Sequence, residues 1–277
     1  MSFVGKLVRK SQASMFWCMQ SLPKAKREAI YTLYAFCKHI DNIVYGNFEK
    51  EEKLELLRAW QEELKNIYDK KVPATNIGRK IYKNCMRFKI QKNDFAEILN
   101  AVLMDFPKTL QAPEYEDFYK YCHGLMEIPV YITLSIMGEF EEEIMRELSK
   151  SFGRAMFITE ILRDVKEDAQ NNRLYMPKEL LHQAGIFSTE PIVVVTDKNL
   201  VAVREQLAKN AVADFDNAFK ILQRRNNKTM RPLKLILHIY KRYFDIMQNR
   251  GWEIMSPKPV IGTKDKFAIA YKVIFDK

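Results

Sequence analysis

The sequence predicts an all-α fold, built as a single domain that spans residues 1–277. Only nine glycines and ten prolines occur in the 277 residues, which leaves little material for the turns of a many-stranded protein. Lys, Glu, Leu, Met and Ala recur throughout, and these residues favour helix. Hydrophobic residues make up 47% of the chain, enough for a sizeable core. No linker rich in Pro, Gly or Ser divides the chain, so we expect one helical bundle.

Helical periodicity divides the chain into a series of long elements. The first runs from 23 to 45, with Pro23 in its first turn and apolar residues three and four positions apart. Pro129 interrupts one of the later helices in principle. The run 188–199, "STEPIVVVTDKN", is interpreted as a loop and is the only place where we allow a strand. The remaining helices are expected at about 50–69, 74–88, 92–104, 115–138, 141–171, 197–225, 230–249 and 263–275.

The net charge of +10 favours polyanionic partners such as nucleic acid, anionic lipid or diphosphates. The lysines are scattered singly and do not form a run interleaved with aromatic residues, so we expect no nucleic-acid binding. The lysines near the C-terminus are most simply a solvated face. Attraction to an anionic membrane is the second interpretation of these residues, Lys264, Lys266 and Lys272.

The cysteines and the apolar segments bear on the cellular compartment. The four cysteines contain no C-x-x-C pair, which fits free thiols in a reducing compartment. No stretch approaches the roughly 20 apolar residues that a membrane span needs, and the N-terminus lacks the apolar core of a signal peptide. We therefore expect a cytoplasmic protein and leave open a peripheral contact with the inner face of the membrane.

A row of carboxylates follows the apolar face of the helix 141–171. Glu160, Asp164 and Asp168 lie at i, i+4 and i+8, so they stack along one line. Like charges at this spacing repel each other and destabilise a helix unless something offsets them. One interpretation is a solvated charge ladder, neutralised by neighbouring basic residues. The other is a site for Mg²⁺, which binds through one or two carboxylates plus water and substrate phosphates. Spacing alone favours the ladder.

A second carboxylate, Asp41, lies on the apolar stripe of the helix 23–45. A carboxylate on an apolar face is costly unless it is paired, binds metal or faces a wet cavity. Asp41 is therefore a candidate for the wall opposite the row, and Lys38, one turn earlier, could meet a diphosphate. Aromatic residues that could line a cavity between the two helices are Tyr34, Phe36, Phe157 and Tyr175.

Three segments resemble the squalene/phytoene synthase family over nearly the whole chain. "SLPKAKREAIYTLYAFCKHIDNIV" resembles its first motif segment, and "ILRDVKEDAQNNRLYMPKELL" resembles the second very closely. "MRPLKLILHIYKRYFDIMQNRGW" resembles the bacterial branch that makes presqualene diphosphate for hopanoid synthesis. The resemblance implies an all-α isoprenoid-synthase fold with a central cavity and head-to-head condensation of two farnesyl diphosphates. It also implies Mg²⁺ held by two D-x-x-x-D motifs, with NADPH needed only if the reaction continues to squalene.

The resemblance also implies roles for individual residues. Asp164 and Asp168 match the second motif, and Asp41 matches the first aspartate of the first motif. The implied catalytic residues are Asp41, Asp164, Asp168 and Tyr34. The resemblance implies Asp41, Asp164 and Asp168 as metal ligands, and the carboxylate row adds Glu160 as a fourth candidate ligand. The implied substrate-binding residues are Lys38, which stands where the family usually has Arg, together with Arg163, Arg173 and Tyr175. Phe157 is added to them as an aromatic residue that could line the cavity.

Several positions depart from the family pattern. Tyr45 replaces the final aspartate of the first motif, and a phenol is a poor Mg²⁺ ligand at neutral pH. Glu160 and Phe157 stand where Asn and Gln are usual, and the bulky run 124–129 should narrow the cavity. Gln12 and Met15 replace the Ser and Phe of the substrate flap. Glu160 could supply the ligand that Tyr45 cannot. Alternatively, the chain is a catalytically degenerate member that acts as a non-enzymatic binding or assembly factor.

Overall fold

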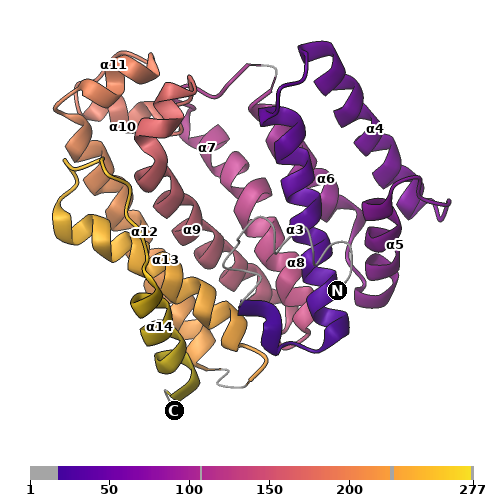
Figure 1. Cartoon of the computed structure of the whole chain (residues 1–277). Helices are drawn as coiled ribbons and strands as arrows, with labels where there is room; N and C mark the ends of the chain where they lie inside the picture. The colour runs from indigo at the N-terminus through magenta and orange to yellow at the C-terminus, as the bar shows by residue number, and fades with distance from the viewer. Residues whose placement is uncertain (1–17, 107, 225–227, 276–277) are drawn as a thin grey trace.

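The computed structural model describes residues 18–275, apart from 107 and 225–227, as a bundle of helices (Figure 1). No β-strand occurs among these residues; one isolated bridge joins Gln111 to Leu174. The all-α prediction is therefore confirmed. The principal helices are α3 (Lys24–Tyr45), α4 (Lys50–Tyr68), α5 (Asn76–Phe88), α6 (Lys92–Met104), α7 (Tyr115–Cys122), α8 (Ile128–Met137), α9 (Glu142–Gln170), α12 (Leu200–Gln223), α13 (Arg231–Arg250) and α14 (Thr263–Phe275). Short helices are η1 (Met19–Ser21), η2 (His123–Glu127), α10 (Lys178–Gln183) and α11 (Pro191–Thr196).

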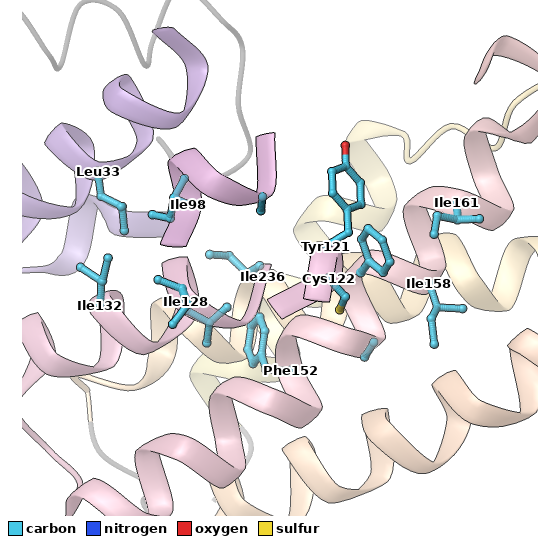
Figure 2. Close-up of a cluster of buried hydrophobic side chains, with 14 of the residues drawn as sticks. Leu33, Ile98, Tyr121, Cys122, Ile128, Ile132, Phe152, Ile158, Ile161 and Ile236 are labelled. Atoms are coloured by element: carbon cyan, nitrogen blue, oxygen red, sulfur yellow. The ribbon is translucent and has the colours of Figure 1, made fainter. Parts of the chain in front are cut away.

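The longest helix, α9, lies in the middle of the bundle (Figure 1). It packs against α12 and α13 on one side and against η2 and α8 on another. Helix α3 packs against α5, α8 and α6 instead, and α4 covers the outside of this group. Figure 2 shows part of the resulting core, with Leu33 of α3, Ile98 of α6, Ile132 of α8 and Phe152 of α9. Among the described helices, none combines the length and the apolarity needed to cross a membrane.

The strand allowed in the run 188–199 is wrong, because its apolar part forms helix α11. Pro191 occupies the first turn of this helix, where the missing N–H of proline costs no hydrogen bond. Val194 is fully buried against the core, while Ile192 and Val193 are about half exposed. Tertiary burial on one side of a helical turn thus outweighs the strand preference of a β-branched run.

The helix expected at 115–138 is interrupted by η2, a π-helical turn between α7 and α8. Two glycines allow this turn to pack closely on its neighbours. A Cβ on Gly124 would lie 2.3 Å from the Cβ of Ala101, and one on Gly153 would lie 2.8 Å from the backbone of Glu127. The turn therefore packs tightly between α6 and α9, and its residues Leu125 and Met126 line the central cavity.

Candidate active site

A cavity of about 410 Å³ lies between α3, α6, η2, α8, α9 and α13. Its carboxylates come from the second halves of α3 and α9, which end on the same side of the bundle (Figure 1). Most of the remaining lining is apolar and includes Leu33, Ile98, Phe152 and Ile236. A pocket of this kind, mostly apolar with a few convergent polar groups, is typical of a small-molecule site.

The carboxylate row of α9 faces this cavity rather than bulk solvent. Glu160, Asp164 and Asp168 all line it, and so does Asp41 of α3. Burial, opposed by Lys38 and reinforced by Glu160, raises the pKa of Asp41 to about 6. Burial and the charge of Asp164 raise the pKa of Asp168 to about 7. The geometry therefore brings the four carboxylates together at one cavity, as the sequence predicts. Their negative charges repel one another.

Glu160 is held by a hydrogen-bond partner from another helix. The hydroxyl of Tyr240 on α13 donates to its Oε1 at 2.6 Å, and both residues line the cavity. Burial raises the pKa of Glu160, while Arg163 and this hydrogen bond oppose the rise. If Glu160 binds a metal, it does so with one of its oxygens already engaged in the hydrogen bond from Tyr240.

Asp164 is the most strongly paired member of the row. Arg163 approaches both of its oxygens, Nε to Oδ1 at 2.9 Å and Nη2 to Oδ2 at 2.6 Å. Lys258 adds a third contact, Nζ to Oδ1 at 2.7 Å. Burial opposes the charge of Asp164, yet these two cations leave its pKa below the usual value. Arg163 and Asp164 therefore meet as the sequence suggested, with Lys258 as an unforeseen partner.

Lys258 belongs to the connector between α13 and α14, residues 251–262. Arg204, fully buried on α12, donates to the carbonyl oxygens of Leu162 on α9 and Trp252 in the connector. This link holds the connector against α9. No local pattern around Lys258 marks it, because its partner Asp164 lies 94 positions earlier and only the tertiary fold brings them together.

Tyr45 belongs to a separate hydrogen-bonded cluster around Asp105, which the sequence analysis missed. Asp105 has a fully buried side chain and accepts the hydroxyls of Tyr45 at 3.0 Å and Tyr175 at 2.7 Å, and the backbone N–H of Leu110 at 2.6 Å. Nε of Arg173 lies 3.5 Å from the same carboxylate. Arg173 and Tyr175 thus support the cavity wall through Asp105, and Tyr175 and Tyr45 also line the cavity.

The other expected site residues divide between two places. Tyr34 and Phe157 line the central cavity, as expected. Lys38 does not: it is exposed and lies along a second cavity of about 300 Å³ between α3, α4 and the start of α5. Phe36 is fully buried against Trp60 and Phe95, so the expectation that it lines the cavity is wrong. The expected changes in the substrate flap, Gln12 and Met15, lie outside the described residues.

The donor set suits a hard cation without forming a closed metal site. Within the described part of the chain, no three His, Cys, Asp or Glu side chains converge closely enough to hold a metal by themselves. Mg²⁺ does not require this, because it keeps several waters and binds through one or two carboxylates together with substrate phosphates. Burial disfavours the charged forms of Asp41, Glu160 and Asp168 and raises the pKa of each, so a bound cation would relieve this cost. The residues present therefore fit Mg²⁺ bound jointly with a diphosphate.

An all-helical bundle around an apolar cavity with facing carboxylates defines the class of isoprenoid synthases. A family model described as Squalene/phytoene synthase matches residues 8–263. The chain therefore belongs to the squalene/phytoene synthase family, a family of transferases in isoprenoid biosynthesis. This confirms the resemblance of the three sequence segments.

Individual relatives cover most of the chain. It is 30% identical to a presqualene diphosphate synthase of Rhodopseudomonas palustris over 93% of this chain and 91% of that protein. It is 27% identical to the chloroplastic phytoene synthase 1 of Arabidopsis thaliana over 88% of this chain and 58% of that protein. The fold matches a crystal structure of a dehydrosqualene synthase with a TM-score of 0.85 at 24% identity, covering 98% and 94% of the two chains. It also matches squalene synthase HpnC of Alicyclobacillus acidocaldarius, with a TM-score of 0.78 at 20% identity over 90% and 94%.

Proposed function

We propose that this protein condenses two farnesyl diphosphates head to head, giving presqualene diphosphate. The observation that carries the proposal is the placement of Asp41, Asp164 and Asp168 around an otherwise apolar cavity. This arrangement can bind diphosphate at one place and hold prenyl chains at another. The relatives named as presqualene diphosphate synthases, which align over nine-tenths of the chain, support the same reaction.

In this reaction the C–O bond of one allylic diphosphate breaks, and its electron pair leaves with the diphosphate. The double bond of the second prenyl chain attacks the allylic carbon. Loss of one proton, taken up by the released diphosphate, closes the cyclopropane ring. The chemistry needs no protein nucleophile; it needs charge stabilisation at the leaving group and an environment free of water. NADPH would enter only if the product continued to squalene.

The chain's own residues meet both needs. Asp164 and Asp168 of α9, with Asp41 of α3, would hold Mg²⁺, which when bound would neutralise charge on the leaving diphosphate. Arg163 and Lys258, already at Asp164, would orient that carboxylate and contribute positive charge. The rings of Tyr34 and Phe157 line the cavity, where an aromatic face stabilises a nearby cation and excludes water.

A second candidate function rests on Tyr45. Its hydroxyl is bound to Asp105 and Tyr121, so this end of α3 offers no carboxylate to a metal. A member of the family that kept the fold and lost prenyl transfer would serve as a binding or assembly factor. The complete second motif favours the enzyme, since a chain without catalysis needs no stack of carboxylates that burial and mutual repulsion destabilise.

The deciding experiment is incubation of the purified protein with labelled farnesyl diphosphate and Mg²⁺, with and without NADPH. We expect a cyclopropylcarbinyl diphosphate without NADPH. Asp164→Ala should lower turnover by about 100-fold or more, as removal of a group that stabilises transition-state charge does. Glu167→Ala is the matched control. Glu167 also lies on α9 and also pairs with Lys258, but its side chain is largely exposed and does not line the cavity.

Two outcomes decide between the candidates. Product formation that Asp164→Ala abolishes and Glu167→Ala leaves within about twofold supports the enzyme. Absence of product above a control without protein, together with absence of metal-dependent diphosphate binding, would reject the enzyme in favour of the binding factor.

We also propose that the protein is cytoplasmic. It would work beside a membrane, because a prenyl product with one diphosphate is an amphiphile.

A further inference from the structure

The C-terminal helix α14 carries a stripe of large apolar side chains that face outward. Phe267 is 72% exposed, Tyr271 67%, Ile274 46% and Phe275 64%. Their spacing of three and four residues places them on one face of the helix. Single exposed apolar residues are ordinary, but four large ones in a contiguous row mark an interaction surface. We call these four residues the α14 stripe.

The outward direction of the α14 stripe is set by contacts on the opposite face of the helix. Val273 is buried and Ile269 is partly buried against the core, so this face packs onto the bundle beside α13 (Figure 1). Arg242 of α13 pairs with Asp265 at 2.9 Å. Arg231, at the start of α13, donates to the carbonyl oxygen of Ile274 at 3.3 Å. The helix is thus held at both ends while the α14 stripe remains uncovered.

Positive charge surrounds the α14 stripe. Lys264, Lys266 and Lys272 are exposed on the same helix, and its one acidic residue within Thr263–Phe275, Asp265, is already paired with Arg242. An apolar face with aromatic residues, bordered by lysines, is typical of a helix that lies in the interface of a membrane. Lysine side chains can place their methylene groups along the apolar surface and their charges among lipid headgroups.

We propose that α14 docks this protein on an anionic membrane, with the α14 stripe inserted at the headgroup boundary. The choice of occupant follows from charge. A second copy seated on the same face would bring two sets of three lysines together, and their repulsion would oppose the contact. An anionic lipid surface neutralises these lysines and takes up the aromatic side chains. The biological purpose, delivery of an amphiphilic product to lipid, rests on the proposed function; the docking itself does not.

The test is co-sedimentation of the full chain with vesicles, with no prenyl diphosphate present. Vesicles of phosphatidylcholine alone are compared with vesicles containing about one-third phosphatidylglycerol, a fraction high enough to give a strongly negative surface. We expect binding to the anionic vesicles that weakens as salt is raised. The double variant Phe267→Ser/Tyr271→Ser should bind at least about tenfold more weakly, because it removes the most exposed rings. The triple variant of Lys264, Lys266 and Lys272 to Gln should lose the preference for anionic lipid.

Phe187→Ser is the matched control, because Phe187 is 76% exposed but lies between α10 and α11, away from α14. It should bind vesicles like the parent chain. Equal binding of the parent to neutral and anionic vesicles would overturn the proposal, as would unchanged binding of the double variant. A dimer in solution that the double variant dissociates would identify a second copy as the occupant instead.

The membrane docking and the proposed reaction are tested independently of each other. Turnover of farnesyl diphosphate is measured in detergent without vesicles, and the double variant should retain it, because neither ring lines the cavity. Vesicle binding without turnover would keep the docking surface and reject the enzyme. Turnover without vesicle binding would support the enzyme and reject the docking surface.

Discussion

The hydroxyl of Tyr45 donates a hydrogen bond of 3.0 Å to the buried carboxylate of Asp105, and this contact defines the altered end of the first motif. Tyr175 donates to the same oxygen at 2.7 Å, and the guanidinium of Arg173 lies 4.0 Å from the centre of the Tyr45 ring. Burial raises the pKa of Tyr45 to about 12, so the phenol, already neutral at pH 7, stays neutral well into the alkaline range. Tyr45 therefore closes the cavity wall at a position where a carboxylate would repel Asp105.

This arrangement predicts unequal costs for two substitutions. Tyr45→Phe removes the hydrogen bonds to Asp105 and Tyr121 and keeps the ring beside Arg173, so the free energy of unfolding should fall by about 1–2 kcal/mol. Asp105→Asn removes the charge at the centre of the cluster and should cost about 3 kcal/mol. Urea denaturation of both variants measures the difference. Equal losses would contradict the central position of Asp105.

The contact between Tyr240 and Glu160 leads to a prediction about metal dependence. Glu160→Gln keeps a carbonyl oxygen that can accept the 2.6 Å hydrogen bond from Tyr240, while it removes the carboxylate charge. If Glu160 replaces the ligand missing at Tyr45, the Mg²⁺ concentration for half-maximal turnover should rise about tenfold or more, since even indirect partners of metal sites cost this much.

Tyr240→Phe is the control for Glu160→Gln, because it removes the hydrogen bond that Glu160→Gln keeps and leaves the carboxylate charge in place. Its Mg²⁺ requirement should stay within about threefold of the parent, below the cost expected for a lost ligand. A Mg²⁺ titration that is the same for Glu160→Gln and the parent would mean that Glu160 serves only as the partner of Tyr240.

The bulky π-helical turn predicts a change in chain-length preference. Leu125 and Met126 line the cavity from η2, so Leu125→Ala/Met126→Ala should enlarge it. The ratio of kcat/KM for a C20 over a C15 prenyl diphosphate should rise about tenfold, a large effect within the range of a hydrophobic pocket. Competition between the two labelled substrates measures this ratio. Ile144→Ala removes a partly buried side chain of α9 that does not line the cavity, and it should leave the ratio unchanged.

The long helices could be predicted because their signal is local and repeated. The helix expected at 141–171 is found at Glu142–Gln170, and the one expected at 92–104 is found at Lys92–Met104. The failures arise where a few residues decide the conformation. In 191–196, β-branched residues favour a strand, but Pro191 and the burial of Val194 favour a helical turn. The π-helical turn depends on close packing at Gly124, which one sequence cannot reveal.

The candidate site was predictable to the extent that it lies on single helices. Asp164 and Asp168 share one face of α9, and helical spacing alone aligns them. Asp105, Lys258 and the bond from Tyr240 could not be found this way. Each acts on a residue at least 60 positions away, so its role exists only once the bundle has formed. Asp105 also lies where the helical pattern stops, and so its carboxylate carries no periodic signal.

His123 predicts a pH dependence of stability outside the site. Its Nδ1 lies 2.8 Å from Glu127 and its Nε2 3.0 Å from Glu97, while Arg154 also binds Glu127 at 2.8 Å. The hydrogen bond with Glu127 is the largest cause that raises the pKa of His123, and burial opposes it. A raised pKa in the folded state means that the protonated ring stabilises the fold below its unfolded pKa of about 6.5. This stabilisation is lost as the pH rises through the folded pKa.

His123→Gln should therefore destabilise the protein more at about pH 6 than at about pH 9, by about 0.5–1 kcal/mol once solvent screening of the half-exposed ring is allowed for. Urea denaturation of the parent and the variant at both pH values measures this difference. Arg154 limits the effect, because it continues to neutralise Glu127 when His123 is lost. His182→Gln, on a ring that packs beside Phe187 instead of between carboxylates, is the matched control. A cost of His123→Gln that is the same at both pH values would mean that the ring holds η2 by neutral hydrogen bonds alone.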